Sequence, residues 1–118
     1  MILISKPSKL HVPPWQMVSA LLGGVSLRVA SWWMAPAIDT TTATTRIDCW
    51  DKSLGQPGAV EIAAGGQFDG TDFSLVGGPG ADRNHSKIGV STSPDTHYVI
   101  LGDMNQQGKK AGDSTGSR

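Results

Sequence analysis

The stretch at residues 85–101, HSKIGVSTSPDTHYVIL, consists of two apolar runs on either side of a polar turn. The flanking segments are His85–Val90 and His97–Leu101, and the turn between them contains Pro94 and Asp95, which favour chain reversal. Two such runs joined by such a turn are typical of a β-hairpin. The sequence therefore predicts a hairpin, and this hairpin carries the most informative polar residues of the chain.

Three further elements are predicted upstream. Apolar residues recur at three- and four-residue spacing over residues 15–22, after two prolines and before two glycines, so we expect a short helix there. Residues 25–30 alternate apolar and polar side chains ahead of Trp32 and Trp33, which predicts a half-buried strand near tryptophans. Within residues 40–50, a run of threonines leads into a second alternating run at residues 46–50, which predicts another strand.

Length and composition limit the classes of protein that fit. The chain has 118 residues, ten basic and ten acidic, which indicates one small domain without an overall basic field for nucleic acid. Fifteen glycines predict many loops, above all over residues 65–80, where Phe68 and Phe73 are expected to anchor the backbone. We expect a loop-rich α/β domain over residues 1–107. The polar tail, 108–118, lacks large apolar residues and is predicted to be disordered.

The most apolar segment, Met17–Ala37, is not predicted to enter a membrane. Arg28 lies in its middle, and the pair Gly23 and Gly24 interrupts it. A small interfacial or membrane-anchored protein is therefore the weakest of the alternatives, and we expect no membrane partner. The sequence indicates no signal peptide and leaves the cellular compartment open.

His85 and Lys87 form the first candidate site. They are separated by one residue, so on a strand both side chains leave the same face. An imidazole can attack phosphorus to form a covalent intermediate, and an ammonium group beside it can neutralise the phosphate oxygens without a metal. This pairing suits cleavage of a phosphodiester. Alone, this pair is weak evidence for a catalytic site, because surface strands often carry polar residues at alternate positions.

Polar residues next to these two extend the candidate site. Gly102-Asp103-Met104-Asn105 follows the second strand of the hairpin, which is expected to return it beside His85. The Asn105 amide could bind a phosphate oxygen or orient the imidazole, and Asp103 could orient it instead. Arg83 and Asn84 are candidate phosphate contacts, with an ordinary surface loop as the equal alternative.

The HSK motif, followed by a strand and GDMN, resembles the second half of the phospholipase D superfamily pattern, and more particularly deoxyribonuclease II. Further similarity in order and spacing covers roughly residues 5–107, including Pro14-Trp15, Trp33–Ile38 and Ile47–Trp50. The resemblance implies an acid endonuclease that cuts double-stranded DNA without divalent metal or cofactor and leaves 3′-phosphates. It also implies a mixed sheet flanked by helices, built as one of two related α/β halves that share an active site.

The family pattern has one His-x-Lys motif in each half, and this chain has one in all. Neither His11 nor His97 has a lysine two residues later. The glycine-rich basic run that follows GDMN in the family is replaced by residues 108–118. We therefore expect a chain that resembles the carboxy-terminal half. Its active site would need an amino-terminal half or a second copy of the chain.

A second interpretation belongs to a different class: a catalytically dead remnant that serves as a structural or protein-interaction domain. The single His-x-Lys motif favours it. His97 is interpreted as a cross-strand residue and Cys49 as a buried, inert thiol. No metal site is predicted, because the remaining aspartates, in glycine-rich surroundings, fit turns better.

Overall fold

The helix predicted over residues 15–22 forms as α1, Pro14–Leu21, in the computed structural model, which describes residues 1–31, 37–78 and 80–112. Pro14 occupies the first turn, where its missing N–H costs no hydrogen bond. Gly23 and Gly24 follow with φ of 87° and 84°, a left-handed conformation that glycine adopts without strain and that ends the helix. The prediction of this helix is confirmed.

A four-stranded mixed sheet lies behind α1, and the two remaining strands form a separate hairpin. The strand order of the four-stranded sheet is β2-β1-β5-β6, with β1 parallel to β2 and the other neighbours antiparallel. The strands are β1 (Leu27–Ser31), β2 (Val60–Ile62), β3 (Gly65–Phe68), β4 (Thr71–Ser74), β5 (Lys87–Ser91) and β6 (Val99–Leu101), with a short 3₁₀ helix η1 (Lys52–Leu54). The chain is a mixed α/β domain, mostly sheet with one α-helix in the described residues.

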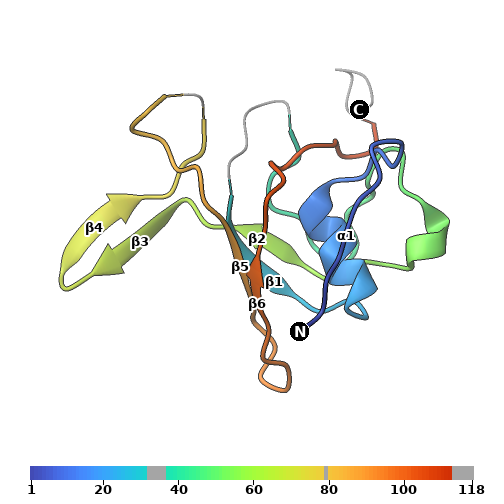
Figure 1. Cartoon of the computed structure of the whole chain (residues 1–118), viewed down its shortest axis with the longest axis horizontal. Helices are drawn as coiled ribbons and strands as arrows, with labels where there is room; N and C mark the ends of the chain where they lie inside the picture. The colour runs from blue at the N-terminus through green and yellow to red at the C-terminus, as the bar shows by residue number, and fades with distance from the viewer. Residues whose placement is uncertain (32–36, 79, 113–118) are drawn as a thin grey trace.

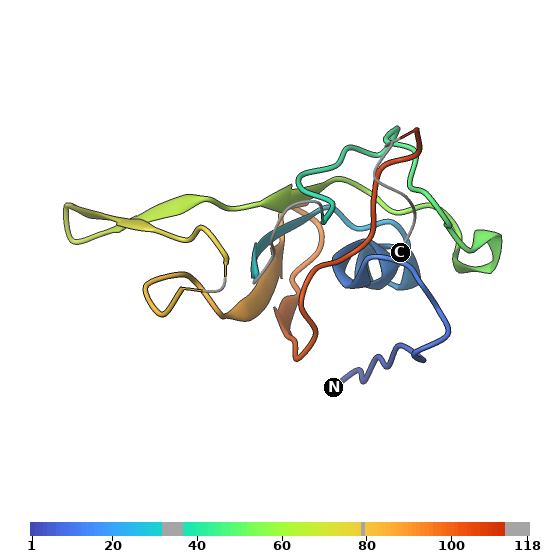
Figure 2. The same cartoon turned by 90° about the horizontal axis from the view of Figure 1, so that it is seen from above.

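Helix α1 covers one face of the sheet, and the β3–β4 hairpin projects on the opposite side (Figures 1 and 2). Trp15 is the centre of the core, packed with Leu27 and Val29 from β1 and with Val60 and Ile62 from β2. Its indole Nε1 donates a hydrogen bond to Ser31 Oγ at 2.9 Å. One large aromatic side chain therefore joins the helix to the sheet.

Gly89, on β5, leaves the space that the Trp15 ring fills. A Cβ at this position would lie 2.7 Å from Trp15 Cζ3 and 3.0 Å from Val29 Cγ1. Gly89→Ala is expected to lower the free energy of unfolding by about 1–3 kcal/mol, because a close-packed core resists added atoms. Urea unfolding measures this. Val90→Ala, at a partly exposed position on the opposite face, is the matched control; an equal loss in both variants would contradict the account.

The prediction of a strand within residues 40–50 is wrong. Thr41 makes a single antiparallel bridge to Val60, and Ile47 makes another to Lys110. Between them the threonines bond to one another: Thr45 Oγ1 accepts a hydrogen bond from the Thr42 N–H at 2.9 Å. Threonine hydroxyls that bond the nearby backbone favour turns over strands. Cys49 is exposed, with a φ of 59°, which also corrects the expectation of a buried thiol.

The glycine-rich segment contains a hairpin that the sequence analysis missed. Asp69 and Gly70, with φ of 49° and 76°, connect β3 and β4, which pair in register from Gly65 opposite Ser74. Asp-Gly between two short strands is a strong hairpin signal that could have been read from the sequence. The expected anchoring role of the two phenylalanines is wrong, because Phe68 is 78% exposed and Phe73 46% exposed.

The described part of the predicted disordered tail, 108–112, is packed against the domain. The Ile38 N–H donates to the Gly108 carbonyl at 2.8 Å, and the Asp48 N–H donates to the Lys109 carbonyl at 2.8 Å. Just before it, Gln106 is buried and bonds both Gln16 Oε1 and the Trp15 N–H. Polar side chains and backbone groups hold this segment. The prediction of disorder, made from the lack of large apolar residues, is therefore wrong for residues 108–112. Residues 113–118, Trp32 and the first four residues of the Trp33–Ile38 motif lie outside the described residues.

Candidate functional site

His85 lies just before β5 rather than on it. The strand begins at Lys87, so the two residues do not share one strand as predicted. The imidazole is exposed, and its Nε2 lies 3.2 Å from the carbonyl oxygen of Gly80. The ring is thus held by the loop before the strand, because residues 80–83 form a turn closed by the Arg83 N–H on the Gly80 carbonyl.

Lys87 begins β5 next to the end of β6. Its Nζ donates a hydrogen bond to the backbone carbonyl of His85 at 2.8 Å. The Gly102 N–H donates to the Lys87 carbonyl at 2.7 Å, and a Cβ at Gly102 would lie 3.3 Å from Lys87 Cβ. Within the described residues no carboxylate forms an ion pair with Lys87. The positive charge of Lys87 therefore lies at the backbone carbonyl of His85, and no carboxylate of the described residues neutralises it.

Asn84 shapes the backbone between the loop and the strand. Its Oδ1 accepts hydrogen bonds from the Ser86 N–H at 3.1 Å and from the Ser86 hydroxyl at 2.7 Å. Its Nδ2 is buried and has no hydrogen-bond partner in the part of the chain that the structure describes. Asn84 therefore supports the turn that presents His85. Arg83, by contrast, is exposed, with its aliphatic stem against Gly78.

The loop after β6 starts beside Lys87, as the hairpin prediction requires. Gly102 is the last residue of this loop bonded to β5, and Asp103 and Asn105 are both exposed. Neither residue makes a hydrogen bond to His85 or Lys87 among the described atoms. The structure thus places Gly102 beside Lys87, whose Nζ bonds the backbone carbonyl of His85, and leaves the roles of Asp103 and Asn105 as predictions.

A groove lies elsewhere on the described surface. It measures about 600 Å³ and is lined by the N-terminal segment, one side of α1 and the edge of β6. Asp103 lines it, but His85 and Lys87 do not. The candidate site therefore lies outside this groove, with the exposed His85 beside a turn.

Among residues 1–31, 37–78 and 80–112, no three histidine, cysteine or acidic side chains come together as a metal-binding group. No helix found in these ranges is long and apolar enough to cross a membrane. Hydrogen bonds from the Ser53 hydroxyl and N–H lower the pKa of Asp51, which lies outside the candidate site.

His85 and Lys87 were predicted from the sequence as candidate site residues, whereas the groups that hold this turn were not. Gly80 and Ser86 supply the carbonyl and the hydroxyl that fix this turn. Neither residue type carries a signal of such a role, since the contacts depend on how the loop folds back. Comparison of the chain with family models, curated proteins and solved structures finds no match.

Proposed function

We propose that this chain is a half-site of a metal-independent phosphodiesterase of the deoxyribonuclease II kind, with DNA as substrate. One observation carries the proposal: Lys87 Nζ donates a hydrogen bond to the backbone carbonyl of His85, whose imidazole is exposed, and no carboxylate among the described residues forms an ion pair with Lys87. Nucleophile and phosphate clamp are thus contributed by one short turn. The phospholipase D-like arrangement of the sheet is part of this proposal.

The hydrogen bonds suggest which atom attacks. When the His85 Nε2–H donates to the Gly80 carbonyl, the lone pair of the neutral ring lies on Nδ1. In the proposed step this lone pair forms a bond to phosphorus while the bond to the leaving oxygen breaks. Lys87 neutralises the phosphate oxygens as charge develops. Arg83, Asn84, Asp103 and Asn105 remain candidate contacts to the rest of the phosphate.

One imidazole supplies only half of the acid–base chemistry. The alkoxide oxygen of DNA leaves well only when it receives a proton, and a second histidine would donate it. In the proposal that histidine comes from an amino-terminal half or from another copy of the chain. The isolated chain is therefore expected to cleave DNA poorly or not at all.

An activated diester tests the half-site by itself. The p-nitrophenolate ion leaves without a proton, so bis(p-nitrophenyl) phosphate removes the need for a second histidine. We expect the purified chain to release a burst of nitrophenolate of about one equivalent per chain, followed by slow turnover. Chelation with EDTA is expected to leave the burst unchanged, because Lys87 supplies the charge that a metal would supply.

Stopped-flow absorbance measures this burst with and without EDTA. Loss of the burst in EDTA would contradict metal independence, and a chain without any burst would contradict the half-site. A monomer that cuts DNA efficiently would show instead that one motif suffices.

A second candidate function, a protein-interaction domain, is favoured by a different observation. The sheet face away from α1 exposes Ile88, Val90, Val99 and Leu101, which form adjacent cross-strand pairs on β5 and β6. Exposed apolar patches of this kind mark interaction surfaces. This function would need no chemistry at His85.

A further inference from the structure

Strand β6 is an open edge of the sheet. It is the last strand in the order β2-β1-β5-β6, whereas Thr41 bridges to Val60 at the opposite edge. Tyr98 and Gly102 bond to β5 through the Ser91 N–H to the Tyr98 carbonyl and the Gly102 N–H to the Lys87 carbonyl. Alternation along the strand then directs the N–H and C=O groups of Val99 and Leu101 outward. No hydrogen bond to these outward groups is found within the described residues.

The side chains of this edge are apolar and exposed. Val99 is 76% exposed and Leu101 80% exposed. Protein edges are commonly guarded by a charged residue, a proline or a bulge, and β6 has none of these. The edge thus offers unpaired backbone groups together with unburied apolar side chains, the combination that an added strand satisfies.

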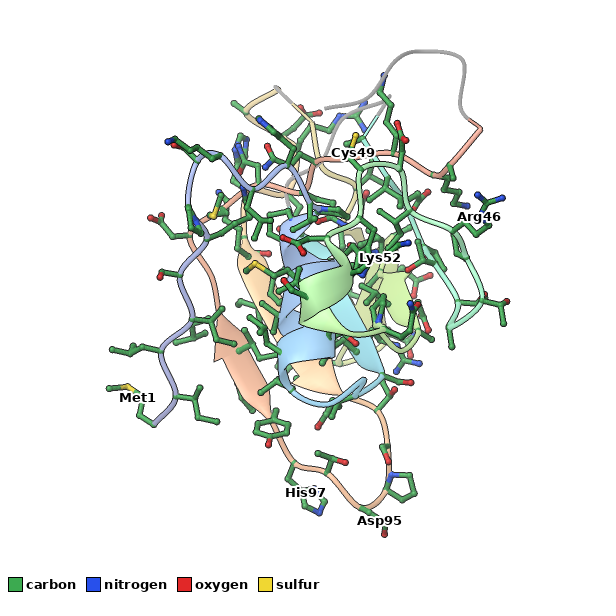
Figure 3. The ribbon with its side chains drawn as sticks, turned by 90° about the vertical axis from the view of Figure 1, so that its right-hand side faces the viewer. Met1, Arg46, Cys49, Lys52, Asp95 and His97 are labelled. Atoms are coloured by element: carbon green, nitrogen blue, oxygen red, sulfur yellow. The ribbon has the colours of Figure 1, made fainter. Side chains whose placement is uncertain are left out.

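A histidine and an aspartate, one beyond each end of β6, identify the added strand. His97 and Asp103 lie three residues on either side of Ile100, and both are exposed. Figure 3 shows His97 at the turn end of the β5–β6 hairpin. In an antiparallel pairing of two identical strands about Ile100, Val99 faces Leu101 of the partner subunit. The same register sets His97 opposite Asp103 of the partner subunit.

We propose that two copies of this chain pair antiparallel through β6, about a two-fold axis at Ile100. The pairing joins two four-stranded sheets into one of eight strands. The outward groups of Val99 and Leu101 form hydrogen bonds across the axis, and each His97 donates a hydrogen bond to a carboxylate, which its imidazole can do in either charge state. An unrelated peptide would satisfy the backbone but has no reason to place a carboxylate opposite His97 and a hydrogen-bond donor opposite Asp103.

This dimer is separate from the proposed phosphodiesterase chemistry. Lys87 lies beside Gly102, at one end of β6. Antiparallel pairing puts the two copies of this end at opposite sides of the axis, so it does not bring the two His85 side chains together. The association can thus be measured apart from any nuclease activity.

Sedimentation equilibrium of the full chain over a range of concentrations tests the pairing, and a reversible monomer–dimer equilibrium is expected. Val99→Pro removes one outward N–H per copy and leaves the inward bonds of β6 in place, so it should weaken dimerisation at least tenfold. Val99→Lys, an ordinary guard of an open edge, should do the same if the proline variant does not fold. Phe68→Ser, at an equally exposed site on β3, is the control and should change nothing.

A charge exchange tests the register. His97→Asp sets two carboxylates opposite each other and should weaken the dimer about tenfold. Adding Asp103→Lys to this variant restores opposite charges and should recover the original affinity. A wild-type chain that stays monomeric, or a double variant as weak as His97→Asp alone, would overturn the proposal. So would a chain that stays monomeric alone yet captures an apolar peptide along β6.

Discussion

Replacing His85 with alanine is expected to abolish the nitrophenolate burst, a loss of at least about 100-fold in rate. The substitution removes the only atom of the half-site that is proposed to bond to phosphorus. The imidazole is exposed and bonded to a single carbonyl, so the free energy of unfolding should change by no more than about 0.5 kcal/mol. Stopped-flow absorbance and urea unfolding on the same preparation separate chemistry from stability.

Two further variants complete this comparison, the first as a control and the second as a test of the phosphate clamp. His11→Ala removes an exposed histidine far from β5 in sequence and should keep the full burst. Lys87→Gln should slow the burst without eliminating the covalent step, because it removes the positive charge and leaves the nucleophile. A burst that survives in His85→Ala would show that another group attacks phosphorus.

The largest loss of stability is expected from Trp15→Ala, about 3–5 kcal/mol. The side chain is 3% exposed, packs against both β1 and β2, and donates a hydrogen bond to Ser31. A small domain has a total stability of about 5–15 kcal/mol, so much of the variant should be unfolded at room temperature. Near-ultraviolet circular dichroism and urea unfolding measure the change.

Trp50→Ala is the matched control for this variant. Trp50 is half-buried and bonds the Gly55 carbonyl within its own loop, so its loss should cost less than about 2 kcal/mol. Equal losses in the two variants would mean that Trp15 is not the centre of the core.

Local patterns predicted the helix, β1 and the β5–β6 hairpin because each is encoded within one short segment. The two apolar runs on either side of the polar turn with Pro94 indicated the hairpin, and the two glycines after Leu22 indicated the end of α1. The same reasoning failed for the residue 40–50 segment. Threonine has a high strand propensity, and here its hydroxyls close a turn with neighbouring backbone groups instead.

Contacts between distant segments explain the other failures. Gln106 is buried because Gln16 and the start of α1 supply its hydrogen-bond partners, ninety and more positions earlier. Hydropathy patterns cannot show such a polar pairing. The same distinction applies to the candidate site. His85 and Lys87 were predicted from their spacing, whereas the position of the Gly80 carbonyl that holds the imidazole depends on the fold of the loop.

The most direct measurement of the proposed function is the mass of the chain during the burst. The reaction with bis(p-nitrophenyl) phosphate is quenched in alkali, which preserves a phosphorus–nitrogen bond, and peptides are then analysed by mass spectrometry. The account predicts one p-nitrophenyl phosphoryl group per chain, attached to the peptide that contains His85 and absent from His85→Ala. A chain that releases nitrophenolate without this adduct, or that carries it on another residue, would contradict His85 as the nucleophile.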